Sequence, residues 1–181
     1  AMAVYLGWKW LYDFNHGLFN YVVKLLGGAP IKFLDSSALV TPSLAFIAVW
    51  LSGNLIVIFL AGLQNVPRTY HEAAEIDGAN AWQRFWKITI PCMTPIIFYN
   101  LLMSLVSNLQ VITPALSLTK GGPGTGSYYM CYMLYQQAFK SHKYGYGSAV
   151  AVILFILIAI FTAILFATSK GWIFYEGDDR E

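Results

Sequence analysis

The sequence predicts an all-α membrane protein. Of its 181 residues, 57% are hydrophobic and only 11% are charged, whereas soluble domains carry about 25% charged residues. The charges are also unevenly spread, because three stretches of 32, 32 and 26 residues, over 36–67, 88–119 and 144–169, contain none. A helix that crosses a bilayer needs about 20 mainly apolar residues. Each uncharged stretch is therefore long enough for one crossing.

Composition excludes several other classes of protein. A soluble enzyme of this size would have too few charged side chains to cover its surface. The chain has 11 basic and 9 acidic residues, which leaves no basic stripe for nucleic acid. Two cysteines cannot form a disulfide scaffold or a four-cysteine zinc site. We therefore expect a lipid bilayer around the chain, no nucleic-acid partner and no cofactor.

The first element is expected at residues 1–14, as the end of an earlier spanning helix. Its aromatic residues Trp8, Trp10 and Tyr12 are typical of the membrane interface. Three further spans are predicted over the ranges 42–63, 91–113 and 147–168. Because three helices and a fraction make a poor closed bundle, we expect one transmembrane domain that is the C-terminal portion of a longer chain.

The connection at 64–90 predicts two short helices around a glycine. Pro67 suits the first turn of a helix, and Gly78 stands where a left-handed residue would end that helix. Asn80 and Gln83 have the spacing of a capping box for the second helix, which places Trp82, Phe85 and Trp86 on one face. Pro91 is expected to begin the next span. The connection at 114–143 has a Gly/Pro cluster and then a tyrosine-rich stretch at the interface.

The 64–90 loop resembles the EAA motif of bacterial ABC importer permeases. Its segment "EAAEIDGANAWQRFWKITIP" has the motif's EAA, then three residues and the motif's glycine, and finally its closing Ile-x-x-Pro. The blocks "HGLFNYVV", "AGLQNVP", "LTKGGP" and "YGYGSA" occur in order around it. Together these blocks make the chain similar to the carbohydrate-uptake permeases of the maltose, lactose and glycerol-phosphate class, over about 8–176.

This resemblance implies a role for each part of the chain. The fold would be the last three spanning helices, plus the end of a fourth, of a six-helix type I ABC importer permease in the bacterial inner membrane. The 64–90 loop would be cytoplasmic and the 114–143 loop outside. Partners would be two ATPase subunits, a second permease subunit and an extracytoplasmic solute-binding protein. The residues implied in coupling to the ATPase are Glu72, Ala73, Ala74, Asp77 and Gly78.

Polar residues inside the predicted spans are candidates for a solute path. Asn100, Ser104 and Asn108 recur every four residues, which places them on one helical face, and Asn54 lies in the preceding span. Trp50, Phe98 and Tyr99 are candidate aromatic platforms for a sugar. The same polar residues could instead hold neighbouring helices together, and the sequence leaves both readings open.

Three functions compete at this point. The first is the membrane path of an ATP-driven sugar importer, and the second is an assembly or scaffold subunit that docks a partner without a solute path. A membrane enzyme is third, because no predicted span carries an acidic residue, a basic residue or a histidine. The segment "HEAAE" (71–75) lacks the second histidine of a zinc-protease helix, so no metal site is expected.

Overall fold

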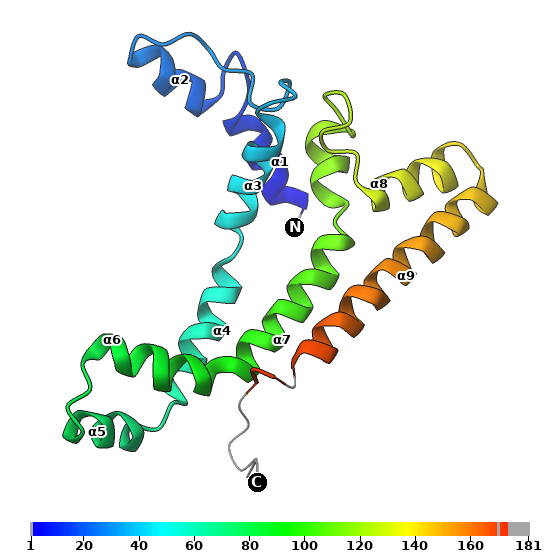
Figure 1. The fold of residues 1–181 in the computed structure, drawn as a ribbon. Helices are drawn as coiled ribbons and strands as arrows, with labels where there is room; N and C mark the ends of the chain where they lie inside the picture. The colour runs from blue at the N-terminus through cyan, green and yellow to red at the C-terminus, as the bar shows by residue number, and fades with distance from the viewer. Residues whose placement is uncertain (1, 170, 174–181) are drawn as a thin grey trace. The chain divides into compact units, whose positions relative to one another are not determined.

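The computed structural model describes residues 2–169 and 171–173, and this part of the chain contains helices and no strands (Figure 1). Twelve elements follow one another, with η marking π-helical segments: α1 (Met2–Leu11), α2 (Leu18–Leu25), α3 (Val40–Trp50), α4 (Gly53–Gln64), α5 (Arg68–Ile76), α6 (Ala81–Arg84), η1 (Phe85–Thr89), α7 (Ile90–Leu109), η2 (Ala115–Thr119), α8 (Met130–Tyr135), η3 (Gln136–Lys140) and α9 (Tyr144–Ser169). They form two units, the first made of 1–51 and 107–156 and the second of 52–106 and the described residues from 157 onward.

Two helices in the described part are long and apolar enough to cross a membrane, namely Ala81–Leu109 and Tyr144–Ser169. A third crossing requires α3 and α4 to be counted together. The sequence predicts one uninterrupted helix over 42–63, but α3 ends at Trp50 and α4 starts at Gly53. Ser52 and Gly53 account for this break, since adjacent glycine and serine weaken the backbone ladder of a helix.

Prolines shape the long helix of the second unit. Pro95 cannot donate to the carbonyl of Pro91, and the Thr94 hydroxyl donates to that carbonyl instead, at 2.7 Å. Pro91 does not begin the helix, which is a correction to the sequence prediction. The chain is already helical from Ala81, and the turn before Pro91 widens so that the Ile90 N–H bonds to the Phe85 carbonyl five residues back. This wider turn is η1, and it accommodates the missing proline donor.

The core of the first unit is an aromatic and aliphatic cluster. Trp8 and Tyr12 are only 7% and 6% exposed and pack with Val40, Leu44, Ile47 and Leu118. Trp8 also contacts Trp50 edge to face, with ring centroids 5.8 Å apart. Their rings thus pack inside the protein, and the expectation that they lie at the membrane interface stays a prediction. They are core residues because the neighbouring α3 and η2 supply apolar partners, whereas Trp10 is 62% exposed.

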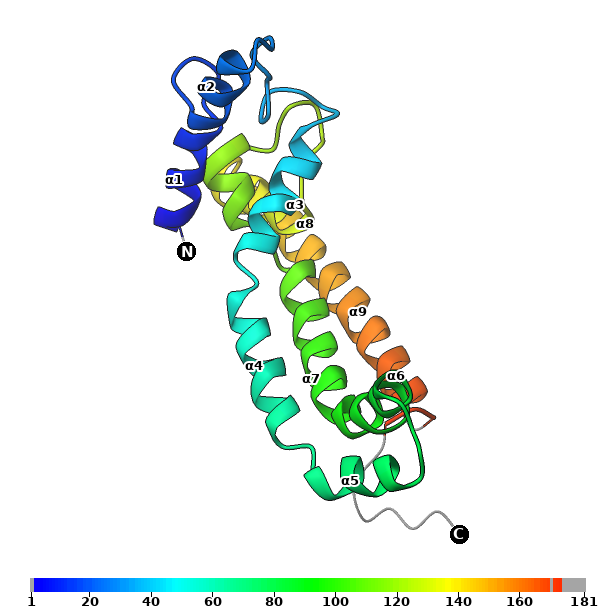
Figure 2. The same cartoon turned by 90° about the vertical axis from the view of Figure 1, so that its left-hand side faces the viewer.

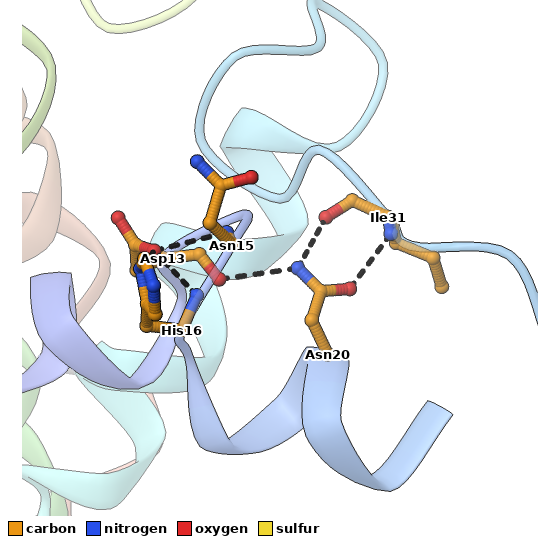
Figure 3. A network of polar contacts seen from close by, with 5 residues as sticks. All are labelled: Asp13, Asn15, His16, Asn20 and Ile31. Carbon is orange, nitrogen blue, oxygen red and sulfur yellow. Dashed lines mark hydrogen bonds and ion pairs between the residues drawn. The ribbon is translucent and has the colours of Figure 1, made fainter. Parts of the chain in front are cut away.

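A buried asparagine organises the loop between α2 and α3 (Figure 3). Asn20 is 1% exposed, and its amide donates to the carbonyls of Asp13 (3.2 Å) and Ile31 (2.9 Å). Its side-chain oxygen accepts from the Ile31 N–H at 2.7 Å. The Asp13 carboxylate in turn accepts from the backbone N–H groups of Asn15 and His16. One side chain therefore ties the end of α1, the helix α2 and the following loop together.

Glycines allow close approaches between helices in both units. In the first unit, a Cβ at Gly147 of α9 would lie 2.8 Å from the Ala138 Cβ of η3. In the second unit, a Cβ at Gly62 of α4 would lie 2.6 Å from a methyl carbon of Ile96 on α7. At Gly147 a side chain would meet Ala138, including its backbone, so α9 packs on η3 this closely because residue 147 is glycine; at Gly62 the Ile96 side chain would have to move.

Candidate functional site

The predicted loop at 64–90 folds as a hairpin of two short helices, α5 and α6. The α5 helix ends at Ile76, and Gly78, two residues later, has a φ of +77°. The Gly78 N–H bonds to the Glu75 carbonyl and the Ala79 N–H to the Ala74 carbonyl, at 3.0 and 2.9 Å. This pair of bonds is a Schellman motif. No described atom lies within 4 Å of a Cβ built at Gly78, so glycine is required there by the left-handed backbone alone.

A capping box begins the second helix of the hairpin, as the sequence predicts. The Asn80 side-chain oxygen accepts from the Gln83 N–H at 2.8 Å. The Gln83 side-chain oxygen accepts from the Asn80 N–H at 2.9 Å. Two donors that the first turn of α6 would otherwise leave unpaired are thereby satisfied. Gly78 and Asn80 together fix where α5 ends and where α6 begins.

An ion pair joins the two helices of the hairpin. An Arg84 guanidinium nitrogen lies 2.6 Å from a Glu75 carboxylate oxygen. The Arg84 side chain is 23% exposed and that of Glu75 is 70% exposed. This contact was not predicted from the sequence, although opposite charges stand on the two sides of a predicted turn. The pair connects α5 to α6 at a point outside the turn itself.

The five predicted coupling residues do not all line the same surface of the hairpin. A groove of about 380 Å³ lies between α5 and the start of α7, and Ala73, Ala74 and Asp77 line it. Its other walls are Tyr70, Lys87, Ile88, Pro91 and Cys92. Glu72 is exposed and lies outside this lining. The small alanine side chains therefore face the hairpin's own groove, while Glu72 remains on a free surface of α5.

The predicted polar stripe differs in burial along its length. Asn100, Ser104 and Asn108 all lie on α7. Asn100 is 5% exposed and donates to the Ile96 carbonyl of its own helix at 2.9 Å. Ser104 is half-buried and Asn108 exposed, and Asn54 is exposed on α4. The hydrogen bond from the Asn100 amide to the Ile96 carbonyl is thus an interaction within the helix that carries both residues.

The candidate aromatic platforms also differ from one another. Phe98 packs edge to face against Phe166 and Trp172, with ring centroids 5.2 and 6.0 Å apart. Its ring is therefore engaged in helix packing. Tyr99 is 57% exposed and Trp50 is 69% exposed, so both keep an accessible ring face.

The model of the family described as binding-protein-dependent transport system inner membrane component matches residues 10–171. The probable ABC transporter permease protein YesP of Bacillus subtilis (strain 168) is 38% identical, over 99% of this chain and 59% of its own. The multiple sugar-binding transport system permease protein MsmF of Streptococcus mutans is 38% identical, over 84% of this chain and 55% of its own. The trehalose/maltose transport system permease protein MalF of Thermococcus litoralis is 34% identical, over 87% and 53%.

A solved structure has the same fold. A chain in the crystal structure of a bacterial alginate ABC transporter, in complex with an alginate pentasaccharide-bound periplasmic protein, superposes with a TM-score of 0.83 at 19% identity. That match covers 94% of this chain and 60% of the other. The chain thus spans between 53% and 60% of the length of these relatives. With its apolar helices, the chain is a multi-pass protein of the bacterial inner membrane, and it belongs to the family of binding-protein-dependent transport system inner membrane components.

Proposed function

We propose that this chain is part of the permease subunit of an ATP-driven importer for a sugar or sugar-like solute. Family membership supports this proposal, as do two relatives whose names specify multiple-sugar and trehalose/maltose transport. In this proposal separate ATPase subunits hydrolyse ATP, and a second permease subunit completes the membrane path. An extracytoplasmic solute-binding protein delivers the solute at the side of the 114–143 loop.

The observation that carries the proposal is the braced construction of the α5–α6 hairpin. Its turn is fixed by the Schellman motif at Gly78, its second helix by the capping box at Asn80, and its two helices by the Glu75–Arg84 ion pair. Together these three contacts restrict the internal motion of the loop. Because α6 continues through η1 into α7, a displacement of α5 would be transmitted directly to a spanning helix.

The five coupling residues have distinct roles in this proposal. Glu72, exposed on α5, pairs with donors of the ATPase surface. Ala73, Ala74 and Asp77 shape the groove that seats α5 against the start of α7. Gly78 sets the angle between the two helices through its positive φ. The solute path would use Asn54, Ser104 and Asn108 together with Asn100, whose amide also bonds to the Ile96 carbonyl of its own helix.

Co-purification of the ATPase subunits with the permease tests the coupling role. The test variant combines Glu72→Lys, which reverses an exposed charge, with Gly78→Val, which places a β-branched residue at positive φ. The matched control combines Asp35→Lys with Gly145→Val, a charge reversal and a glycine replacement in the other unit, where a Cβ at Gly145 meets no described atom within 4 Å.

We expect the control to retain the ATPase subunits and the test variant to lose them, while both remain inserted in the membrane. Retention of the ATPase by the test variant would place the docking surface outside the hairpin and refute the coupling role. Loss from both variants would show that the effect is not specific to this loop.

A further inference from the structure

Three aromatic side chains form an exposed cluster on α6 and η1. Trp82, Phe85 and Trp86 contact one another, with ring centroids 5.4 to 6.1 Å apart. Their exposed fractions are 70%, 39% and 53%. Exposing this much aromatic surface to water is unfavourable, and an exposed apolar patch of this kind marks a contact surface. The structure itself indicates which surroundings the cluster meets.

The α6–η1 segment has two opposite faces. Arg84 is two positions from both Trp82 and Trp86, which is about 200° around a helix. Its guanidinium pairs with Glu75 of α5, and Lys87 lines the groove that α5 forms with this segment. The cationic face is therefore turned toward α5. The aromatic face is consequently turned away from α5 and from its exposed Glu72.

The orientation of the hairpin shows where that aromatic face points. In Figure 1, α6 runs across the base of α7 instead of along its axis, and α5 lies beyond α6 on the side away from α4 and α7. Figure 2 gives the same order from the side, with α6 seen nearly end-on. The face of α6 opposite α5 therefore lies on the side from which the spanning helices rise. That side is the bilayer.

The length of α7 indicates the depth at which the α6–η1 segment lies in the bilayer. The 20 residues of α7 extend for about 30 Å, which equals the thickness of the hydrocarbon core. Residues just before Ile90 then lie in the headgroup layer, which adds about 5–7 Å on each side of the core. Because α6 runs across the axis of α7, residues 82–86 remain near that layer.

We propose that the α6–η1 segment is a membrane-interface anchor whose Trp82, Phe85 and Trp86 side chains insert into the lipid headgroup region. Tryptophan prefers this region because its ring is apolar and its N–H can still reach water or lipid oxygen. The acidic residues of α5 are held on the far side, away from lipid phosphates. The occupant of the aromatic surface is thus the bilayer, and this assignment does not depend on the ATPase-coupling role.

Tryptophan fluorescence in lipid nanodiscs, without ATPase subunits, tests the proposal. One form of the chain keeps Trp82 and has its five other tryptophans replaced by phenylalanine. The matched control has all six replaced and carries Ile76→Trp, a position on α5 of the same hairpin that is 87% exposed. Lipids brominated near the headgroup quench rings in the interface, and iodide quenches rings in water.

We expect Trp82 to emit at shorter wavelength than the Ile76→Trp control. Brominated lipid should quench Trp82 at least about twofold more strongly, and iodide about twofold less, as its depth implies. Since replacing five tryptophans can disturb folding, the Trp82→Phe variant of the otherwise unchanged chain provides a second measurement. It should lose a component of the emission that brominated lipid quenches.

Equal iodide quenching at both positions would overturn the proposal, because the cluster would then lie in water. Protection of Trp82 from iodide that develops only when ATPase subunits are added would also overturn it, and would assign the cluster to protein docking. In both cases the co-purification result for Glu72→Lys with Gly78→Val would be unaffected, so the two proposals can fail separately.

Discussion

Replacing Asn20 by alanine removes all three hydrogen bonds that its side chain makes with Asp13 and Ile31. A hydrogen bond contributes about 1 kcal/mol net, so three lost bonds amount to about 3 kcal/mol. The site is 1% exposed, so water cannot simply replace the amide. A change of this size raises the population of the locally opened loop by about 150-fold.

Hydrogen–deuterium exchange of the loop at 27–34, followed by mass spectrometry in nanodiscs, measures this opening directly. The Ile31 amide is the most informative proton, since it bonds to the Asn20 side chain at 2.7 Å. We expect its exchange to accelerate by one to two orders of magnitude, roughly in line with the loss of about 3 kcal/mol. Exchange in helix α9 should be unchanged, because local opening leaves distant helices intact.

Asn15→Ala is the matched control for Asn20→Ala. Asn15 is an exposed neighbour in the same network, and it enters through its backbone N–H, which the substitution preserves. Its exchange profile should match that of the unmodified chain. An acceleration at Ile31 of less than about threefold in Asn20→Ala, or an equal one in Asn15→Ala, would refute the view that the buried amide holds this loop.

Four further predictions follow from the structure. Arg84→Gln should weaken retention of the ATPase subunits, and the charge swap Glu75→Arg with Arg84→Glu should restore it; the effect should be modest, since partly exposed pairs contribute about 0.2–1 kcal/mol, and failure of the swap to restore binding would argue against a brace. Gly147→Val should destabilise the α9–η3 contact by about 1–3 kcal/mol, because its Cβ would lie 2.8 Å from the Ala138 Cβ; its thermal unfolding temperature should fall below that of Gly145→Val, and equal temperatures would contradict the close contact. The backbone N–H groups of His16 and Asn15 lower the pKa of Asp13, so the stabilising effect of the ionised carboxylate is present above its ordinary pKa of about 3.9 and is lost as pH falls through the lowered value. NMR titration of the Asn15 and His16 amides should detect the loss of their hydrogen bonds in acid, and Asp13→Asn should abolish this pH dependence. Asn108→Leu should reduce solute uptake by the assembled transporter while the amount of protein inserted in the membrane stays nearly the same. Unchanged uptake with Asn100→Leu and with Asn108→Leu would refute the solute-path assignment.

Local chemistry explains why some features could be predicted from the sequence. The positive φ of Gly78 and the capping box at Asn80 and Gln83 depend on residues within a few positions of one another, and both are present. The apolar character of α7 and α9 is likewise a property of each segment alone. These features require no knowledge of which elements meet in space.

The features that were not predicted from the sequence mostly depend on contacts between elements that lie apart along the chain. Trp8 and Tyr12 are aromatic in a pattern typical of a membrane interface, and only their contact with α3 and η2 makes them core residues. The Glu75–Arg84 pair requires α5 and α6 to fold back on each other. The role of Asn20 requires Ile31 to return to α2 after an eleven-residue excursion. The break at Ser52 and Gly53 was not predicted because the stretch around it contains no charged residue and is long enough for one uninterrupted crossing.

The π-helical segment η1 sets the rotational phase between the hairpin and the spanning helix. A π-turn holds about one residue more than an α-turn, which offsets the faces before and after it by about 100°. The aromatic face of α6 therefore does not continue straight into the face of α7 that buries Met93 and Asn100. Deleting one residue within η1 would turn the hairpin by about this angle and carry the tryptophans off their present side. The single extra residue thus acts as a spacer that decides which way the loop faces.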